Sequence, residues 1–463
     1  MFDRKIYVQR RKSLKNRMQS GLILFLGNEE SPMNYQDNAY RFRQDSSFLY
    51  FFGLDSPSLA GVIDVDEDED ILFGNDVDVE DIIWMGSKPL LKERALRVGV
   101  KETKPLSKLE ETLRKALKKG KRIHYLPPYR PETIVKLERL LGISFSFIKD
   151  YFSEELTRAV VEQRSIKSKE ETEQIEKAHA LTYEMHTKAM KMARQGRYER
   201  EIVGEIEGIV YSAECLLAFP TILTINGQIL HNHYHGNILE KGRLVVNDSG
   251  AESSLHYAAD ITRTIPVDGK FSQKQKEIYE IVLDSQKEAI QSIKPGIKYK
   301  DVHLKCARII ASGLKEIGLM NGSTDEAISA GAHALFFPHG LGHMLGLDVH
   351  DMENLGEELV GYDKTIKRSG QFGLASLRLA KELKPGFVLT VEPGIYFIPA
   401  LIEKWKAEKK FPQFINYEKV ERYIDFGGIR IEDDVVVTEG GHRVLGKSIP
   451  KAVEELEEIT ATE

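Results

Sequence analysis

The sequence predicts an α/β (α+β) protein with two domains, a smaller N-terminal α/β domain over residues 1–157 and a larger C-terminal domain over residues 158–463. A chain of 463 residues is longer than one hydrophobic core usually supports, which favours two domains. In the first third, short apolar runs alternate with segments of helical periodicity, as in an α/β domain. In the remainder, long helical segments precede apolar runs that carry acidic residues.

Composition and charge exclude several classes of protein. The chain is 41% hydrophobic and 29% charged, as in a globular protein, and its net charge of -6 argues against a nucleic-acid binder. The apolar runs fall short of the roughly 20 residues of a membrane span, and the basic N-terminus lacks the apolar stretch of a signal peptide. The two cysteines, Cys215 and Cys306, fit a reducing compartment. We therefore expect a cytoplasmic protein with no membrane or nucleic-acid partner.

The N-terminal elements follow from periodicity and turn residues. The basic segment 4–19 has the pattern of an amphipathic helix with a solvated face. The acidic run 66–70 lacks the order of acids, glycine and distal glutamate that marks an EF-hand calcium loop. This domain shows no catalytic constellation, so we expect it to shape a site or to make oligomer contacts. The other predictions are strands at 21–29, 46–54 and 122–126, a hairpin formed by 59–65 and 70–73, and helices at 107–119 and 131–141.

The C-terminal part begins with a helix over residues 169–193, in which apolar or small residues recur at steps of three and four. A second helix follows over residues 198–213. Gly196 and Tyr198, between these helices, have a faint echo in Gly296 and Tyr299, about 100 residues later. That offset is too long for a solenoid repeat. It predicts a domain built from two related α/β halves.

The most informative stretch is PHGLGHMLGLDVH, residues 338–350, which places three histidines within thirteen residues. Glycines between them allow tight turns and a close approach to a ligand. Four apolar, β-rich segments elsewhere, 244–250, 258–267, 385–396 and 427–438, each carry an acid inside or at the end of a strand, and in 385–396 the apolar alternation breaks at the acid into Pro-Gly. An unpaired buried carboxylate is strongly disfavoured, so such acids are expected to share cations. The acids are, in order, Asp248, Asp260, Glu392 and Glu432.

Four carboxylates together with His343 predict a metal site. Oxygen-rich ligation with one imidazole favours Mn, Co, Fe or Zn. One divalent ion would leave part of the negative charge uncompensated, which predicts two ions. Such a pair can activate water and polarise a carbonyl group, which is metal-assisted hydrolysis. Glu392 or Glu432 could bind through one oxygen, and a carboxylate near that water could accept its proton.

A second group of histidines forms a His-x-His-x-His run at His231, His233 and His235. This run could be a second metal site. We favour a loop with His231 at the mouth of the main site, because His231 closes a strand-like run just before the Asp248 strand. The remaining histidines are expected to be structural or exposed: His124, His179, His186, His256, His303, His333 and His442.

Four further residues are candidates for contacts with a substrate. His350 is a plausible hydrogen-bond donor, whereas His339 either supports the metal site or contacts the substrate. Arg430 is expected on the same strand face as the acid two residues later, and it can pair with a ligand carboxylate or with the substrate. Arg378 is either an exposed residue or a clamp for a substrate carboxylate.

Five motifs in this order resemble those of the pita-bread metallopeptidases, specifically the aminopeptidase P and prolidase branch: ILH, NDSG…YAADITRT, PHGLGHMLGLDVHD, LTVEPGIYF and GGIRIEDDVVVT. The match covers about residues 160–450, and YRFRQDSSFLYFFGL is similar to the N-terminal domain of that branch. The resemblance implies a pita-bread catalytic domain with an internal duplication. It implies a dinuclear site, usually manganese, with the four acids and His343 as ligands. It also implies that His231 and His350 contact the substrate, that Arg430 supports them, and that Glu392 accepts the proton of the bridging water.

The resemblance further implies hydrolysis of the bond between an N-terminal residue and a following proline. An aminopeptidase P accepts longer peptides, whereas a prolidase accepts dipeptides. We favour an Xaa-Pro aminopeptidase. An Xaa-Pro dipeptidase is the alternative, because Arg378 lies in a run similar to prolidases, where an arginine can hold the free carboxylate of a dipeptide. A non-catalytic binding protein or a metal-free hydrolase is disfavoured because all five ligand positions are filled. A methionine aminopeptidase is disfavoured by the large N-terminal domain. The resemblance suggests a homo-oligomer, either a dimer or a tetramer.

Overall fold

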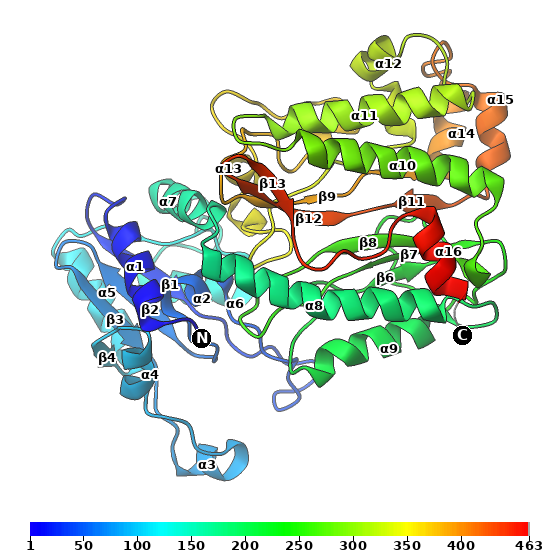
Figure 1. The fold of residues 1–463 in the computed structure, drawn as a ribbon. Helices are drawn as coiled ribbons and strands as arrows, with labels where there is room; N and C mark the ends of the chain where they lie inside the picture. The colour runs from blue at the N-terminus through cyan, green and yellow to red at the C-terminus, as the bar shows by residue number, and fades with distance from the viewer. Residues whose placement is uncertain (462–463) are drawn as a thin grey trace. The chain divides into compact units, whose positions relative to one another are not determined.

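The computed structural model describes residues 1–461 and contains two compact units (Figure 1). The first unit comprises Met1–Arg164 together with Glu353–Leu359. The second comprises residues 165–352 and the chain from Val360 onward. Helix α7 (Glu154–Ser165) runs across the boundary predicted between residues 157 and 158, and that boundary stays a prediction.

The first unit is built on a mixed five-stranded sheet in the order β4-β3-β2-β1-β5. The predicted hairpin with its acidic tip is confirmed, because β2 and β3 pair antiparallel. Apolar side chains of the sheet form a core with those of α5 and α6, which confirms the two predicted helices. The strands are β1 (Leu22–Leu26), β2 (Ala60–Asp64), β3 (Glu69–Phe73), β4 (Glu102–Lys104) and β5 (Ile123–His124), and the helices are α1 (Arg4–Lys15), α4 (Leu91–Arg97), α5 (Leu109–Lys118) and α6 (Pro131–Leu141).

The strand predicted at residues 46–54 is wrong, because this segment forms helix α2 (Ser46–Phe52). The Asp45 side chain accepts a hydrogen bond from the Phe48 N–H and so caps the N-terminus. Gly53, at φ +61°, ends the helix. Every residue of α2 is buried, so the sequence lacks the pattern of apolar and polar side chains that would distinguish a helix from a strand. Phe48 and Phe52 stack with ring centroids 5.2 Å apart, as residues one helical turn apart can.

Helix α3 (Val79–Met85) lies at the tip of an extended excursion between β3 and α4 (Figure 1). All seven of its residues are exposed, including Ile83 at 71%, Trp84 at 77% and Met85 at 71%. Such a concentration of exposed large apolar side chains is unusual on a protein surface.

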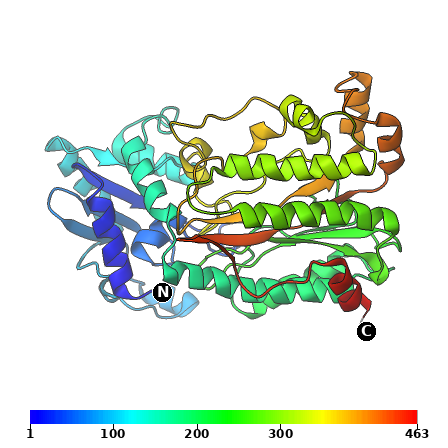
Figure 2. The same ribbon diagram turned by 45° about the horizontal axis from the view of Figure 1, so that its top comes forward.

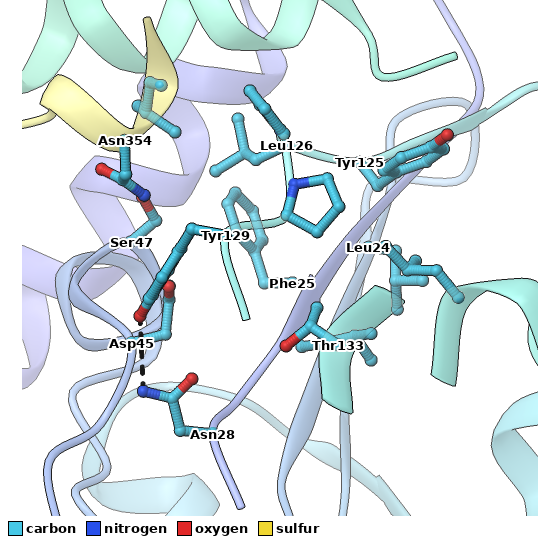
Figure 3. A pocket seen from close by; sticks show the side chains of 15 residues that line it. Leu24, Phe25, Asn28, Asp45, Ser47, Tyr125, Leu126, Tyr129, Thr133 and Asn354 are labelled. Carbon is cyan, nitrogen blue, oxygen red and sulfur yellow. Dashed lines mark hydrogen bonds between the residues drawn. The ribbon is translucent and has the colours of Figure 1, made fainter. Parts of the chain in front are cut away.

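Residues 353–359, although late in the chain, belong to the first unit. Asn354 and Leu355 line a small cavity together with Phe25, Leu126 and Tyr129 (Figure 3). Leu355 is 2% exposed. The cavity has a volume of about 40 Å³, which gives room for ordered water. This late segment therefore completes the packing of the N-terminal unit.

In the second unit, strands lie between two pairs of helices (Figures 1 and 2). Helices α8 (Lys169–Met192) and α9 (Glu199–Ser212) cover one side, and α10 (Gln273–Ser292) and α11 (Tyr299–Glu316) cover the other. The strands form the antiparallel sheets β6-β7-β8 and β13-β12-β9 and the pair β10-β11. Their bounds are β6 (Ile222–Thr224), β7 (Leu244–Ser249), β8 (Ile261–Pro266), β9 (Val388–Val391), β10 (Gly394–Tyr396), β11 (Gly428–Arg430), β12 (Asp433–Thr438) and β13 (Gly441–Val444).

The two helix pairs repeat the same local contacts. The N–H of Gly196, at φ +87°, donates to Leu239 O at 2.9 Å, and the N–H of Gly296, at φ +84°, donates to Leu383 O at 2.9 Å. Each glycine adopts a left-handed conformation that suits this residue type. These matched contacts support the predicted duplication.

The remaining α-helices are α12 (Thr324–Ala330), α13 (Glu357–Val360), α14 (Pro399–Ala407), α15 (Tyr417–Val420) and α16 (Val453–Ala461). Within residues 1–461, every helix is too short or too polar to cross a membrane.

Candidate metal centre and active site

Two of the four predicted β-rich segments each form two strands. The run 385–396 forms β9 and β10, and the run 427–438 forms β11 and β12. The break at Glu392 agrees with the end of the apolar alternation predicted there, whereas the break at Glu432 was not predicted. Pro393 has no N–H and cannot continue a ladder, so the chain leaves β9 there and pairs elsewhere. The breaks place Glu392 and Glu432 at the junctions between strands.

Strand registers bring the acids together. Asp248 on β7 pairs with Thr262 on β8, and Asp260 lies directly before β8. In the other sheet Val391 pairs with Asp433, so the next residues on the two strands are Glu392 and Glu432. The Glu432 N–H donates to Thr262 O at 3.1 Å, which ties the two sheets together.

His343 completes the cluster. One ligand atom from each of Asp260, His343 and Glu432 lies within 4.8 Å of the others, and all three residues are buried. The Nε2 atom of His343 is 3.4 Å from Asp260 Oδ2 and 3.6 Å from Glu392 Oε1. Its Nδ1 atom is 3.1 Å from Met344 O, so a proton there leaves the Nε2 lone pair directed at the carboxylates.

The buried acids of the cluster are costly to ionise together. Burial, followed by neighbouring carboxylates, raises the pKa of Asp260 and Glu432 well above the ordinary value, and burial raises the pKa of Glu392 to about 7. Within the described part of the chain, Asp248 Oδ1 and Asp260 Oδ1 are buried and have no hydrogen-bond partner. Buried oxygens of this kind, with one imidazole, fit hard or borderline divalent cations.

This is the one group of three such ligand atoms among the described residues. The run at His231, His233 and His235 does not form a second one. His231 and His233 are exposed, and His235 Nδ1 lies 3.2 Å from Leu223 O.

A chain of hydrogen bonds runs from Asp248 away from the cluster. Arg430 donates to Asp248 Oδ2 and, at 3.0 Å, to the Tyr396 hydroxyl oxygen. That hydroxyl lies 2.9 Å from His339 Nε2, and His339 Nδ1 lies 2.8 Å from Gly340 O. Burial and Arg430 lower the pKa of His339 to about 3, so this imidazole is neutral at neutral pH. Both of its ring nitrogens are therefore occupied by the protein.

The other predicted site residues lie beside the cluster. The ring centroids of His343 and His350 are 4.2 Å apart, and Arg378 Nη1 lies 3.3 Å from His350 Nδ1. Desolvation and then the charge of Arg430 lower the pKa of the exposed His231, on which Arg378 and His350 also act. The structure thus gathers all the candidate residues into one region.

The sequence did not identify three supporting residues. Tyr396 connects Arg430 to His339. Thr262 donates to Glu432 Oε2 at 2.7 Å, and Asp434 Oδ2 accepts the N–H of Asp260 at 2.9 Å. A usable signal existed for Asp434, because it follows Glu432 by two residues and so shares its strand face. For Tyr396 the signal is the β10-β11 register, which the sequence does not show.

Comparison with known proteins agrees with this arrangement. The sequence matches metallopeptidase family M24 over residues 173–439 and the aminopeptidase P N-terminal domain over residues 7–124. Human Xaa-Pro dipeptidase is 33% identical, with 96% of this chain and 90% of the human protein covered. A probable Xaa-Pro aminopeptidase of Sordaria macrospora is 32% identical, with 95% and 91% covered.

Solved structures give the same result over the whole length. An alanine variant of Escherichia coli aminopeptidase P in complex with substrate has a TM-score of 0.81 at 31% identity, covering 99% of this chain and 98% of the other. Pseudomonas aeruginosa aminopeptidase PepP has a TM-score of 0.82 at 28% identity, again covering 99% and 98%. The chain therefore belongs to metallopeptidase family M24, in the pita-bread branch of aminopeptidase P and prolidase.

Proposed function

We propose that this metallopeptidase is an Xaa-Pro aminopeptidase that hydrolyses the bond between an N-terminal residue and a following proline. The observation that carries the proposal is the buried cluster of Asp260, His343 and Glu432 with Asp248 and Glu392 beside it. Its relatives named as Xaa-Pro peptidases cover nearly the whole chain. The imino bond of proline excludes ordinary peptidases, because proline lacks an N–H and has a fixed φ.

The family's divalent ions would be held by the four carboxylates and His343. We propose two ions, with manganese as the first choice and cobalt, iron or zinc as alternatives. E. coli aminopeptidase P has been solved in a zinc-substituted form with product. Metal ions at such a site polarise a carbonyl group and lower the pKa of bound water. The proposed ligands are Asp248, Asp260, His343, Glu392 and Glu432.

The protein side chains supply proton transfer and orientation. Glu392, with a pKa raised to about 7 by burial, is suited to accept a proton from the attacking water. We propose that His350 and His231 contact the substrate and stabilise the tetrahedral intermediate. Arg430 orients Asp248. The occupied ring nitrogens of His339 favour a supporting role, in which it fixes Tyr396, over direct contact with the substrate.

A second candidate, an Xaa-Pro dipeptidase, is favoured by one observation. Arg378 is only partly buried and lies 3.3 Å from His350, beside the proposed substrate residues. A guanidinium group there could hold the free carboxylate of a dipeptide through paired hydrogen bonds.

The deciding experiment compares hydrolysis of an Xaa-Pro dipeptide and an Xaa-Pro-Yaa tripeptide with added manganese. Faster release of Xaa from the tripeptide would support the aminopeptidase, and Arg378→Ala would then change the rate little. Turnover of the dipeptide alone would support the dipeptidase, with a large loss in Arg378→Ala. Hydrolysis of neither peptide by the metal-loaded protein would refute both.

We also propose that the protein is a cytoplasmic homo-oligomer, either a dimer or a tetramer. The exposed Ile83, Trp84 and Met85 of α3 support association with a second copy, because exposed apolar patches commonly mark interfaces. Cys215 and Cys306 are buried thiols that form no disulfide within residues 1–461, which suits a reducing compartment. Light scattering on the wild type and on Ile83→Ser/Trp84→Ser tests the assembly. An unchanged oligomer would show that α3 is not its interface.

A further inference from the structure

A buried ion pair lies outside the cluster of Asp260, His343 and Glu432 but next to the loop that carries His343 and His350. Lys167 Nζ is 2.9 Å from Asp351 Oδ2, and each side chain is 1% exposed. Lys167 lies between α7 and α8, whereas Asp351 directly follows His350. The pair therefore joins two segments that are 184 residues apart in sequence.

Asp351 is the centre of a small network at the base of this loop. Its N–H donates to Met344 O at 2.9 Å, and its Oδ1 atom accepts the Asp348 N–H at 3.4 Å. A side chain at Gly346 would meet both members of the pair, because an added Cβ would lie 2.5 Å from Asp351 Oδ2 and 2.9 Å from Lys167 Cε. The loop is thus built closely around the ion pair.

The opposite end of the pair is also fixed. The Lys167 N–H donates to Gly386 O at 2.8 Å, and the Gly386 N–H donates to Val437 O on β12 at 2.8 Å. Met352, immediately after Asp351, has φ +66° and is fully buried. A left-handed methionine costs about 1 kcal/mol or more and persists only where its surroundings fix it.

His350 is therefore held on one side by its neighbour Asp351 and borders His343 and Arg378 on the other. We infer that the Lys167–Asp351 pair is a positioning device, which sets the His350 imidazole relative to the metal cluster and to Arg378. This inference rests on the proposed function, in which His350 contacts the substrate.

The physical chemistry of buried ion pairs agrees with positioning rather than with stability. Desolvation of two buried charges largely cancels their attraction, so apolar residues of similar volume can replace such pairs with little loss of stability. A buried pair does impose one geometry on the segments that carry it. Small displacements of substrate-contacting groups can lower rates by about a hundredfold.

The test uses the full-length, metal-loaded protein and three variants. Lys167→Met removes the ammonium partner of Asp351, Lys167→Arg keeps the pair, and Lys167→Met/Asp351→Leu removes both charges while keeping the site filled. We expect kcat for an Xaa-Pro-Yaa peptide to fall about tenfold to a hundredfold in Lys167→Met and in the double variant. We expect Lys167→Arg to recover most of the rate. If the double variant regains the Tm that Lys167→Met loses but not its kcat, the pair acts by positioning and not through stability.

Action through His350 is tested by a double-mutant cycle. In a His350→Ala background, Lys167→Met should have little further effect on kcat, because the group that it positions is already absent. If the two effects multiply, or if Lys167→Met loses bound metal, the inference is wrong. Asp70→Asn, which breaks the Arg11–Asp70 pair of the N-terminal unit, is the matched control and should leave kcat unchanged.

A readout that does not require activity separates this inference from the proposed function. In the zinc-loaded protein, whose metal is diamagnetic, the imidazole NMR signal of His350, assigned as the one missing from His350→Ala, should shift in Lys167→Met and return in Lys167→Arg. If the wild type hydrolyses no Xaa-Pro peptide but the signal behaves in this way, the function fails and the positioning stands. An unmoved signal would overturn the positioning even in an active enzyme.

Discussion

Tyr396 is a residue whose importance comes entirely from its place in the folded chain. Its hydroxyl lies between Arg430 Nη1 and His339 Nε2, and Arg430 in turn holds Asp248. Burial raises the pKa of this phenol to about 12, so it remains a hydrogen-bond donor throughout the neutral range. A neutral His339 accepts that hydrogen bond while Arg430 donates to the same oxygen.

Tyr396→Phe is therefore expected to reduce kcat about fivefold to tenfold, the value of one hydrogen bond, while bound metal stays unchanged. Steady-state kinetics and metal analysis of the purified variant provide the measurement. Tyr423→Phe removes the hydroxyl of a buried tyrosine that stacks on Phe397, and it should leave kcat at the wild-type value. Equal losses in the two variants would contradict a specific role for Tyr396.

At the scale of single residues, the sequence predicts the chemistry better than the contacts. The four acids and His343 stand out because charged groups in apolar strands need a reason. Tyr396 does not stand out, since a tyrosine at the end of an apolar run is ordinary. Its role arises from pairing with a strand more than 30 residues later in the chain.

Strand β12 connects the two sheets of the catalytic unit through one carboxylate. Asp434 Oδ2 accepts the N–H of Asp260 at 2.9 Å and also lies 2.9 Å from His179 Nε2. Asp434 is fully buried, so its position is fixed by these two neighbours.

Asp434→Asn should weaken metal affinity about tenfold to a hundredfold, the usual cost of disturbing a residue that orients a ligand. Competition against a chelator measures this affinity. Asp325→Asn, at a side chain that is 75% exposed on α12, is the matched control and should bind metal as the wild type does. An unchanged affinity in Asp434→Asn would show that Asp260 needs no such support.

The contact of α2 with β2 depends on one glycine. A Cβ added to Gly61 would lie 2.2 Å from the ring of Phe52. Gly61→Ala should therefore lower the free energy of unfolding by about 1–3 kcal/mol through overpacking. Gly204→Ala on α9 is the control, because an added Cβ there meets open space in the described chain and should stabilise the helix by about 0.5–1 kcal/mol. Urea denaturation of both variants tests the difference in sign.

At the scale of elements, helices and strands with clear periodicity were predicted, whereas helix α2 and the break of the run 427–438 at Glu432 were not. In α2 every side chain is buried, so the sequence shows neither the helical period nor the strand period of apolar residues. Pro393 marks the first break locally, whereas the break at Glu432 reflects a change of the backbone's pairing partner. Local sequence cannot report such a change, because it is decided by segments far along the chain.

For the whole molecule, the buried acids of the cluster link stability to pH in the absence of metal. Asp260, Glu392 and Glu432 have raised pKa values, so the folded metal-free protein holds protons that the unfolded chain releases. Stability then falls as pH rises from about 4.5, where unfolded carboxyl groups titrate, through the folded values. Bound metal replaces these protons and removes the decline.

Thermal denaturation with and without chelator, at intervals from about pH 5 to pH 8, tests this linkage. The Tm of the metal-free protein should drop relative to that of the loaded protein as pH rises. Glu392→Gln should flatten the part of the curve near neutral pH. A metal-free Tm that rises with pH in parallel with the loaded form would contradict the prediction.

The late segment 353–359 has a consequence for how the gene can be divided. A protein fragment that ends at residue 164 would contain the first sheet and its helices without the strip 353–359, which includes Leu355. Such a fragment would expose apolar surface along β1 and after β5, and a synthetic peptide of the missing strip could restore it in trans. The two units are therefore not interchangeable modules, because a shuffled or truncated gene would have to carry this strip with the N-terminal part.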